Sequence, residues 1–364
     1  MEGRVMVMAG GTGGHVFPAL AVADELRQRG AEVFWLGTPN SFEARVVPEH
    51  GYELEQISIK GLRGKGLMSW LTAPFKLLMA MNQAAAVIRR RKPNLVIGMG
   101  GFASGPGGLV ARLLGKPLVI HEQNAVPGMT NRWLARLATR VLEAFPGSFS
   151  TDRSATVTGN PVRADIAAVA APQERFADRQ GSLRLLVLGG SQGAQALNET
   201  VPQAVAAMDE TVRPVIRHQA GRNKLEATQA IYQQMAVDAE VMPFVKDMAE
   251  AYAWADLVVC RAGALTVAEL AAAGVGSVLV PFPHAVDDHQ TRNGRYLADG
   301  DAALLIDQSQ LSEQWLRDRL MELSADREKV LSMAQAARAL ALPTATVEVA
   351  DICESVLTEG GQRR

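Results

Sequence analysis

Two glycine-rich segments carry the residue types best suited to bind an anion in this chain. Residues 10–15 read Gly-Gly-Thr-Gly-Gly-His, and residues 189–194 read Gly-Gly-Ser-Gln-Gly-Ala. Each follows a short apolar run and precedes a helical pattern, which in the first case runs from Pro18 to Arg29. Backbone N–H groups at a helix start can therefore approach a phosphate. The repeat predicts two similar units with a cleft between them for a ligand that carries phosphate.

His15 follows the first glycine segment directly, where its imidazole would project toward the bound ligand. This position makes it a candidate general base or oxyanion donor. The alternative is a structural hydrogen bond at the start of a helix. A nicotinamide cofactor is not expected, because Val16 stands where a dinucleotide fingerprint needs glycine and the next apolar run, residues 33–36, ends without an acid for the ribose.

Two further polar segments follow apolar runs in the first half. Residues 98–106 are rich in glycine and suggest a second anion cradle, with close packing of strand and helix as the alternative. Residues 121–124 read His-Glu-Gln-Asn after an apolar run, at the carboxyl edge where ligands bind to open α/β sheets. Four consecutive polar residues at such an edge indicate a site rather than a core.

Residues 260–269 form another connection from strand to helix and suit the rest of a nucleotide. Backbone N–H groups of residues 264–266 would point at a diphosphate. Glu269 would lie within the first turn of the following helix, and its carboxylate would accept hydrogen bonds from the two ribose hydroxyls. The alternative leaves Thr266 and Glu269 as a capping box and nothing more.

Asp299 and Asp301 match the D-x-D pattern by which many glycosyltransferases hold a divalent metal. The intervening glycine is ordinary turn chemistry between a helix and a strand. We therefore expect a turn here and no metal site. Gln290 and Asn293 lie in a preceding polar segment that suits contact with a sugar.

Residues 67–81 form the most apolar stretch of the chain, and basic residues flank it at positions 63, 65 and 89–92. Pro74 and Lys76 argue against a helix that spans a bilayer. An apolar face with a basic collar suits insertion at an anionic membrane surface. The alternative is a helix that packs on the core and has a solvated basic end.

The elements that must position these residues alternate regularly along 364 residues: short Val, Ile and Leu runs are separated by amphipathic helical patterns. This order predicts an α/β fold with two Rossmann-like, doubly wound parallel-sheet domains facing across a cleft. We expect domains at residues 1–160 and 161–340, with the turn at 159–161 as the hinge. Residues 341–364 should form a helix that packs back on the N-terminal domain.

Charge divides between the two halves of the chain. Residues 1–160 hold 18 Lys and Arg against 11 Asp and Glu, and residues 161–364 hold 19 against 27. A basic first half favours an anionic membrane or substrate. Cys260 and Cys353 suit a reducing compartment. We expect no secretory signal, no membrane span and no nucleic-acid partner.

Seven of these motifs occur in the order seen in the MurG family of glycosyltransferases, which the chain resembles over nearly its whole length. They are residues 10–15, Gly-Leu-Arg-Gly-Lys-Gly at 61–66, 98–101, 121–124, Gly-Asn-Pro-Val-Arg at 159–163, 189–194 and 262–266. The resemblance implies a GT-B fold and an inverting transfer that needs no metal cofactor. GlcNAc would move from UDP-GlcNAc to the MurNAc 4-hydroxyl of undecaprenyl-diphosphate-MurNAc-pentapeptide (lipid I) and give lipid II.

The resemblance also implies roles for individual residues, with His15 as the candidate base. The residues implied to bind substrate are Thr12, Gly13, Gly14, Asn124, Arg163, Ser191, Val245, Ala264, Leu265, Thr266, Val267, Ala268, Glu269 and Gln290. Among them Ser191 would contact the diphosphate, Val245 the uracil through its backbone, Glu269 the ribose and Gln290 the GlcNAc. Lys246 departs from the family pattern, in which an acid usually follows the aliphatic residue.

The implied partners are UDP-GlcNAc, lipid I and an anionic membrane surface reached through residues 63–92, with cell-wall or division proteins as further candidates. The implied location is the cytoplasmic face of the bacterial inner membrane, as a peripheral protein. One alternative is a UDP-GlcNAc 2-epimerase, which can share the two-domain architecture. Another is a membrane-bound scaffold that has lost catalysis.

Overall fold

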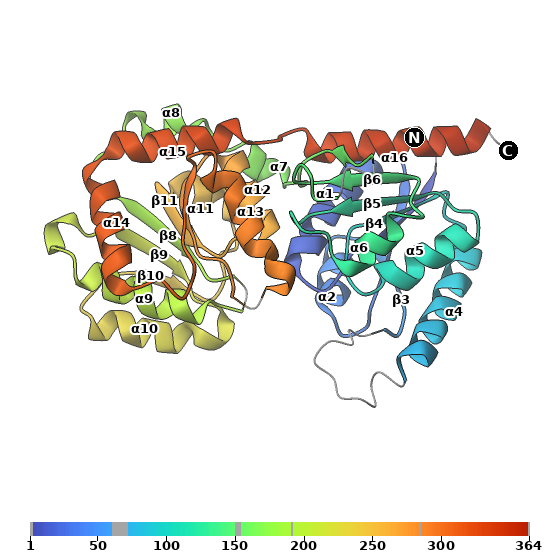
Figure 1. Cartoon of the computed structure of the whole chain (residues 1–364), viewed down its shortest axis with the longest axis horizontal. Coiled ribbons are helices and arrows are strands. Elements are labelled where there is room, and N and C mark those ends of the chain that lie inside the picture. The colour runs from blue at the N-terminus through green and yellow to red at the C-terminus, as the bar shows by residue number, and fades with distance from the viewer. Residues whose placement is uncertain (1–2, 60–71, 150–153, 191, 284, 363–364) are drawn as a thin grey trace. The chain divides into compact units, whose positions relative to one another are not determined.

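The computed structural model divides into two compact units, and the chain crosses between them twice (Figure 1). The first unit comprises Met1–Arg163 and Pro343–Arg364, and the second unit comprises Ala164–Leu342. The residues described are 3–59, 72–149, 154–190, 192–283 and 285–362. The second unit is thus an uninterrupted stretch of chain inserted between the two parts of the first.

The first unit contains a parallel sheet of seven strands in the order β3-β2-β1-β4-β5-β6-β7. Its strands are β1 (Arg4–Met8), β2 (Glu32–Gly37), β3 (Glu53–Gln56), β4 (Leu95–Gly98), β5 (Leu118–Glu122), β6 (Arg140–Glu143) and β7 (Thr156–Val157). Its helices are α1 (Gly13–Gln28), α2 (Phe42–Glu49), α4 (Ala73–Arg91), α5 (Ser104–Leu113), α6 (Met129–Leu134) and α16 (Ala345–Gln362).

The second unit contains a parallel sheet of six strands in the order β10-β9-β8-β11-β12-β13. Its strands are β8 (Arg184–Leu188), β9 (Val215–Gln219), β10 (Glu240–Met242), β11 (Leu257–Cys260), β12 (Gly276–Leu279) and β13 (Ala303–Leu305). Its α-helices are α7 (Ala164–Ala167), α8 (Pro172–Ala177), α9 (Gln195–Ala206), α10 (Leu225–Gln234), α11 (Met248–Trp254), α12 (Ala264–Ala273), α13 (His289–Ala298), α14 (Glu313–Ala325) and α15 (Arg327–Ala339). Short 3-10 helices lie at Glu210–Val212, Arg222–Lys224 and Val286–Asp288.

Both sheets reverse their strand order at the same place, between the first and fourth strands of each unit. These strands are β1 and β4 in the first unit and β8 and β11 in the second. Ligands of open α/β sheets bind outside the carboxyl ends of the strands at such a switch point. All four of the glycine-containing segments at 10–14, 98–101, 189–193 and 262–264 follow these strands.

Apolar residues cover both faces of the first sheet, as expected for parallel strands buried between helices. The C-terminal helix α16 supplies Val349, Cys353 and Val356 to this core. It lies beside α1, although some 320 residues separate the two helices along the chain (Figure 1). The end of the chain therefore belongs to the first unit.

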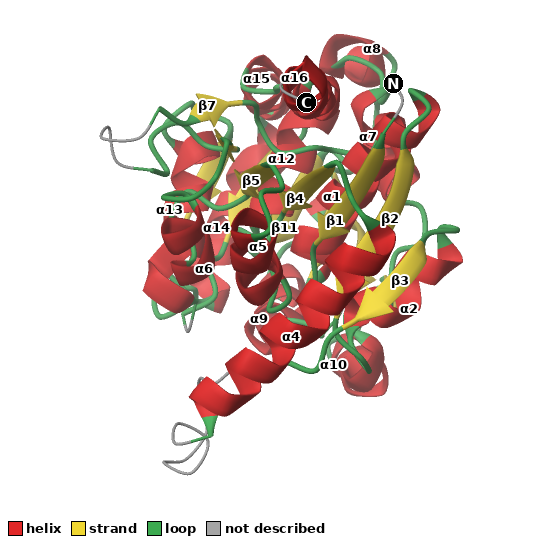
Figure 2. Ribbon diagram, turned by 90° about the vertical axis from the view of Figure 1, so that its right-hand side faces the viewer, coloured by secondary structure: helices red, strands yellow, loops and turns green. Residues whose placement is uncertain are grey.

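Helix α4 has two halves with different surroundings. Ala84, Val87 and Ile88 in its second half are buried in the core of the first unit. Residues 74–79 in its first half are all exposed, with Phe75 71% and Leu78 59% accessible. In Figures 1 and 2 these first turns extend beyond the other elements of the first unit. Of the helices described, none is long and apolar enough to cross a membrane.

Candidate functional site

The first glycine loop, residues 9–12, connects β1 to α1 and is fixed by contacts on several sides. Trp35 Nε1 donates to the Ala9 carbonyl at 2.8 Å and fixes the chain where the strand ends. Gly11 has φ +91°, a conformation that favours glycine. Thr12 is the N-cap of α1, so Gly13, Gly14 and His15 form the first turn of that helix. The helix begins five residues before the predicted start at Pro18.

A second loop, residues 98–101 after β4, packs directly against the first glycine loop. A Cβ on Gly101 would lie 2.6 Å from the Gly10 nitrogen, and one on Gly100 would lie 2.6 Å from His15 Cδ2. Both glycines also have positive φ, +97° at Gly100 and +89° at Gly101. Close packing therefore explains the glycines at these two positions, but the packing is against the first glycine loop and His15 rather than between a strand and a helix as we considered.

His15 contacts both loops. Its Nδ1 lies 3.2 Å from the Gly10 carbonyl oxygen. Because a carbonyl oxygen only accepts, this hydrogen bond requires the proton on Nδ1 and leaves the ring lone pair on Nε2. The ring packs against Gly100. The structure thus holds His15 in the tautomer that a general base acting through Nε2 needs.

Glu43 on α2, which no sequence pattern marks as a site residue, lies beneath the first glycine loop. Its side chain is buried, with 1% of the residue exposed. One carboxylate oxygen accepts from Gly11 N at 2.9 Å, and the other accepts from Thr38 N at 3.1 Å and Thr38 Oγ1 at 2.7 Å. Ser41 caps α2 by accepting from Ala44 N and so fixes the helix that carries this acid.

The charge state of Glu43 follows from these contacts. Burial alone would raise the pKa of its carboxyl group. Hydrogen bonds from Gly11 and Thr38 outweigh that effect, and the pKa lies below its ordinary value. Glu43 is therefore a carboxylate at neutral pH.

The polar residues at the end of β5 form an internal network. His121, Glu122 and Gln123 are at most 2% exposed. Glu122 accepts four hydrogen bonds, from Asn124 N and Nδ2, Gly128 N and Asn131 Nδ2. These bonds fix the loop that follows β5 and leave Glu122 poorly suited to act as a base.

His121 is fully buried and its Nε2 donates to the Gly159 carbonyl oxygen at 2.9 Å. Burial lowers its pKa to about 4, so the ring is neutral at physiological pH.

Two further predicted site residues lie in the first unit. Asn124 lies on the loop that follows β5, and the Arg163 guanidinium lies 5.9 Å from the centre of the Phe17 ring of α1. The first unit thus brings Asn124 to the end of β5 and Arg163 to α1.

The second glycine loop, residues 189–193, connects β8 to α9. Gly193 has φ +69°, and a Cβ there would overlap the Ala220 carbonyl oxygen. Lys224 Nζ donates to the Gly193 carbonyl oxygen at 3.1 Å. Ser191, the predicted diphosphate contact, lies outside the described residues.

Helix α12 begins after its N-cap Gly263, so Ala264, Leu265 and Thr266 are its first three residues. The N–H groups at such positions have no partner within the helix and can meet an anion. Val267 N already donates to the Gly263 carbonyl oxygen at 2.9 Å, and Ala268 follows it in the helix. The structure thus offers the N–H groups of residues 264–266 rather than that of Val267.

Glu269 lies in the second turn of α12, not in the first turn as predicted. It is 7% exposed, and its Oε2 accepts from the Tyr252 hydroxyl at 3.0 Å. The alternative of a capping box with Thr266 is wrong, because the N-cap is Gly263 and it makes no side-chain cap. Tyr252 comes from α11, and the sequence analysis did not identify it as a partner of Glu269.

Val245 lies in the loop between β10 and α11 and is 5% exposed. Its N–H donates to Gln219 Oε1 at 3.1 Å, from the last residue of β9. This bond fixes the backbone that was predicted to meet a uracil. Gln219 was not identified from the sequence, because 26 residues separate it from Val245.

Gln290 and Asn293 both lie on α13 but in different surroundings. Gln290 Oε1 accepts from Phe282 N at 2.8 Å at a partly exposed position. Asn293 is fully buried and donates to the Ala262 carbonyl oxygen at 3.3 Å, so its suggested contact with a sugar is not supported. Asp301 has φ +59° in the turn before β13. The described residues contain no group of three or more His, Cys, Asp or Glu suited to a metal.

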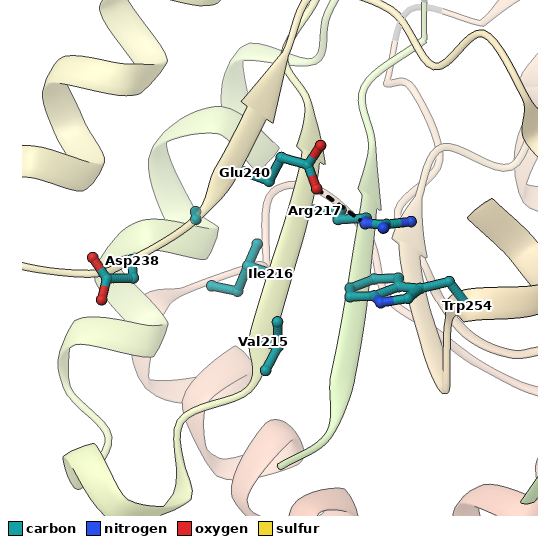
Figure 3. A pocket seen from close by; sticks show the side chains of 7 residues that line it. Val215, Ile216, Arg217, Asp238, Glu240 and Trp254 are labelled. Carbon is teal, nitrogen blue, oxygen red and sulfur yellow. Dashed lines mark ion pairs between the residues drawn. The ribbon is translucent and has the colours of Figure 1, made fainter. Parts of the chain in front are cut away.

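A pocket of about 500 Å³ lies in the second unit, at the amino ends of the strands and therefore at the edge of the sheet opposite the glycine loops (Figure 3). It is lined by Val215, Ile216, Arg217, Asp238, Ala239, Glu240 and Trp254. These residues lie near the amino ends of β9 and β10, away from the second glycine loop. The Arg217 guanidinium pairs with Glu240 at 3.0 Å and stacks on Trp254 at 4.3 Å. Its positive charge is therefore neutralised within the protein, and the pocket is not a candidate anion site.

Comparison with known proteins identifies the family. The N-terminal domain of glycosyltransferase family 28 matches residues 5–143, and the C-terminal domain of that family matches residues 184–354. The crystal structure of Acinetobacter baumannii MurG superposes with a TM-score of 0.85 at 45% identity, covering 97% of this chain and 99% of that one. The chain belongs to the MurG family.

Curated relatives give the same family. The UDP-N-acetylglucosamine–N-acetylmuramyl-(pentapeptide) pyrophosphoryl-undecaprenol N-acetylglucosamine transferase of Marinobacter nauticus is 56% identical over 96% of both chains. The enzyme of the same name from Nitrosococcus oceani is 57% identical over 97% of this chain and 98% of its own. These matches confirm the MurG resemblance, the GT-B fold with two doubly wound sheets, and the assignment as a glycosyltransferase.

Proposed function

We propose that this chain transfers GlcNAc from UDP-GlcNAc to the 4-hydroxyl of MurNAc in lipid I, giving lipid II for peptidoglycan synthesis. The observation that carries this proposal is the identity of 56–57%, over nearly the full length, to relatives named for this transfer. The glycine loops at both switch points add the chemistry that a diphosphate donor and a diphosphate-linked acceptor require.

The reaction is a direct displacement at the anomeric carbon. His15 Nε2 takes the proton of the MurNAc 4-hydroxyl, and that oxygen bonds to the anomeric carbon from the face opposite the UDP. The bond from carbon to UDP oxygen breaks, and its electron pair leaves with the diphosphate. His15 suits this role because its Nδ1 hydrogen bond to Gly10 keeps the lone pair on Nε2.

The donor lies in the second unit. Backbone N–H groups of Ala264, Leu265 and Thr266 at the start of α12, together with the second glycine loop, hold the leaving diphosphate. Glu269 accepts from the ribose, and Gln290 contacts the GlcNAc. The Val245 carbonyl oxygen accepts from the uracil. In the first unit, Thr12, Gly13, Gly14, Asn124 and Arg163 also contact substrate, and no metal cofactor takes part.

The exposed half of α4 binds the membrane that carries the acceptor. Residues 74–79 are exposed around a full turn of helix, which leaves Phe75, Leu77 and Leu78 without a core to pack on. Arg90 pairs with Glu55 and Arg91 pairs with Glu53. We therefore expect the other basic residues that flank this stretch to make the contacts with anionic lipid. The rest of the predicted segment, at residues 63–71, lies outside the described residues.

On this proposal the protein binds the cytoplasmic face of the inner membrane as a peripheral protein. The first unit serves as the acceptor and membrane domain, and the second as the UDP-GlcNAc domain. Cell-wall and division proteins remain candidate partners at the same membrane.

The transfer is tested by incubating the chain with labelled UDP-GlcNAc and a lipid I analogue with a short polyprenyl chain. Label in a disaccharide product that forms only with the acceptor supports the proposal. Formation of UDP-ManNAc from UDP-GlcNAc alone would assign an epimerase instead. Binding of both substrates without turnover would assign a scaffold. Loss of transfer in EDTA, restored only by a divalent ion, would contradict the absence of a metal.

Membrane binding is tested with Phe75→Glu combined with Leu78→Glu and vesicles that contain anionic lipid. Both side chains are exposed, so the fold should persist while binding to sedimented vesicles falls. The matched control combines Met321→Glu with Leu342→Glu, which are 43% and 42% exposed in the second unit. Equal binding by both double variants would remove α4 from the membrane contact.

A further inference from the structure

We propose that Glu43 is a positioning residue for His15 and acts through the peptide group that joins Gly10 to Gly11. The inference rests on the proposed function in one respect, that His15 is the base of the transfer. Glu43 itself touches neither substrate nor reacting atoms.

The two hydrogen bonds that carry the inference end on one peptide group. Gly11 N donates to Glu43 Oε2 at 2.9 Å, and the Gly10 carbonyl oxygen accepts from His15 Nδ1 at 3.2 Å. The nitrogen of Gly11 and the carbonyl of Gly10 are the two ends of the same planar amide. A carboxylate on the N–H end polarises that amide and makes its oxygen a stronger acceptor.

The surroundings hold this peptide group in one orientation. Gly101 packs against the backbone of Gly10 so closely that a Cβ would lie 2.6 Å from its nitrogen. Trp35 Nε1 fixes the preceding carbonyl of Ala9 at 2.8 Å. The amide therefore cannot turn its oxygen away from the imidazole without breaking this packing.

The carboxylate is fixed equally well on its other side. Thr38 donates to the second oxygen of Glu43 from both its N–H and its hydroxyl. A Cβ on Gly10 would lie 2.6 Å from the Glu43 carboxyl carbon, and one on Gly37 would lie 2.8 Å from its Cγ. Two glycines thus provide the space in which the side chain lies.

This arrangement gives His15 what an acid supplies directly in a Ser-His-Asp triad. There, a carboxylate on the far ring nitrogen fixes the tautomer and stabilises the imidazolium that forms when the base takes its proton. Here, the amide passes the same polarisation from Glu43 to Nδ1 of His15. Loss of the charge on Glu43 should weaken the Nδ1 hydrogen bond and lower the rate of proton transfer while substrate binding persists.

The decisive variant is Glu43→Gln, which keeps the shape of the side chain and removes its charge. Because both oxygens of Glu43 accept hydrogen bonds, the glutamine NH₂ group would face a donor, Gly11 N or Thr38, and one of these hydrogen bonds would be lost. The matched control is Tyr52→Phe, which removes the partly buried hydrogen bond from the Tyr52 hydroxyl to Asp24 in the same unit, outside the glycine loops. Both variants lose an interaction with a carboxylate, and only the first changes the support of His15.

Steady-state kinetics provide the first measurement. We expect kcat of Glu43→Gln to fall about 10- to 100-fold, in the range of other residues that orient a functional histidine, with the KM for UDP-GlcNAc within about twofold of the native value. Tyr52→Phe should keep the native kcat. A fall in kcat that is no larger for Glu43→Gln than for Tyr52→Phe would overturn the proposal.

The second measurement is independent of turnover. The ¹⁵N signals of the His15 ring, recorded without substrate, report which nitrogen carries the proton. We expect protonation at Nδ1 in the native chain and in Tyr52→Phe, and a shift toward Nε2 protonation in Glu43→Gln. An unchanged tautomer in Glu43→Gln would contradict the relay even if the chain is an active transferase. A shifted tautomer in a chain without transferase activity would support the relay and contradict the proposed function.

If Glu43→Gln gives no folded protein, Glu43→Asp provides the same two measurements. It keeps the charge but withdraws it from Gly11 by one methylene group. We expect a smaller fall in kcat, again with an unchanged KM. A native kcat and a native tautomer in Glu43→Asp would count against the proposal.

Discussion

The first and second glycine loops occupy the same place in their units, but the side chains that hold them carry opposite charges. Beneath the first loop, the buried carboxylate of Glu43 accepts from Gly11 N. Beside the second loop, the ammonium group of Lys224 donates to the Gly193 carbonyl oxygen. The strand order around both loops is the same, so the difference lies in the side chains that support the backbone.

This difference indicates what each loop can bind. A fixed negative charge beneath the first loop favours the positive charge that develops on His15 during proton transfer. A positive charge beside the second loop favours the diphosphate of UDP. We infer that changes in the first unit act mainly on turnover and changes in the second act mainly on donor binding.

The largest expected effect separates turnover from binding. His15→Ala should lower kcat by about 10²- to 10⁴-fold, because it removes the general base, while the affinity for UDP stays native. Initial rates and calorimetry with UDP measure the two quantities. His50→Ala is the control, since that imidazole also bonds to a backbone carbonyl, of Val46, but lies outside the loops. Equal losses of affinity and kcat would place His15 in the donor site.

Substitution of two glycines in the second loop distinguishes the effect of close packing on stability from the effect of backbone conformation. Gly190 and Gly193 both have positive φ. Among the residues that the structure describes, no atom lies within 4 Å of a Cβ placed on Gly190, whereas a Cβ on Gly193 would overlap the Ala220 carbonyl oxygen. Gly190→Ala should lower the free energy of unfolding by about 1 kcal/mol, and Gly193→Ala by about 3 kcal/mol with weaker UDP binding. Urea titration and calorimetry measure both effects. Equal losses would show that the contact with Ala220 yields easily.

Glu269 tests whether the second unit recognises the ribose. Glu269→Gln should raise the KM for UDP-GlcNAc about 10-fold, because it removes a charged acceptor. The increase should be smaller with a 2′-deoxyribose donor, which lacks one of the hydroxyls. Tyr252→Phe retains the carboxylate and removes one of its donors, so its effect should be smaller still. An equal increase for both donors would remove the ribose role.

The smallest expected effect concerns the charge beside the second loop. Lys224→Met should weaken UDP binding about threefold at low salt and less at high salt, because the ammonium is partly exposed and screened. Calorimetry at two salt concentrations measures the difference. A loss that does not depend on salt would show that Lys224 supports the loop through its hydrogen bond alone.

The sequence predicted the fold where the signal is local. Apolar runs that end in glycines identify β1 and β8 and the loops that follow them, because a buried strand and a close backbone approach both restrict residue type. The start of α1 was placed too late, since Gly13, Gly14 and His15 carry no apolar residue that could show the helical period. The core-packing alternative is confirmed for the second half of helix α4, whereas its first half is exposed and its membrane contact stays a prediction.

The partners of the site residues could not be predicted in this way. Glu43 contacts Gly11 across 32 residues, and Gln219 contacts Val245 across 26. Each pair joins residues that lie at or beyond the ends of different strands, so the contact depends on how helices and loops pack over the sheet edge. No pattern in the residues around Glu43 indicates that this acid is buried. The glycines that pack against it, Gly10 and Gly37, can be seen to end apolar runs in the sequence.

The insertion of Ala164–Leu342 between the two parts of the first unit has a consequence for synthesis on the ribosome. All of the second unit is synthesised before α16 is made, so the first unit, whose synthesis begins earlier, is the last to be complete. Until then the nascent first unit lacks Val349, Cys353 and Val356 and exposes the apolar surface of α1 that they cover. A message cut short after residue 342 would therefore release one finished domain attached to one that cannot close its core.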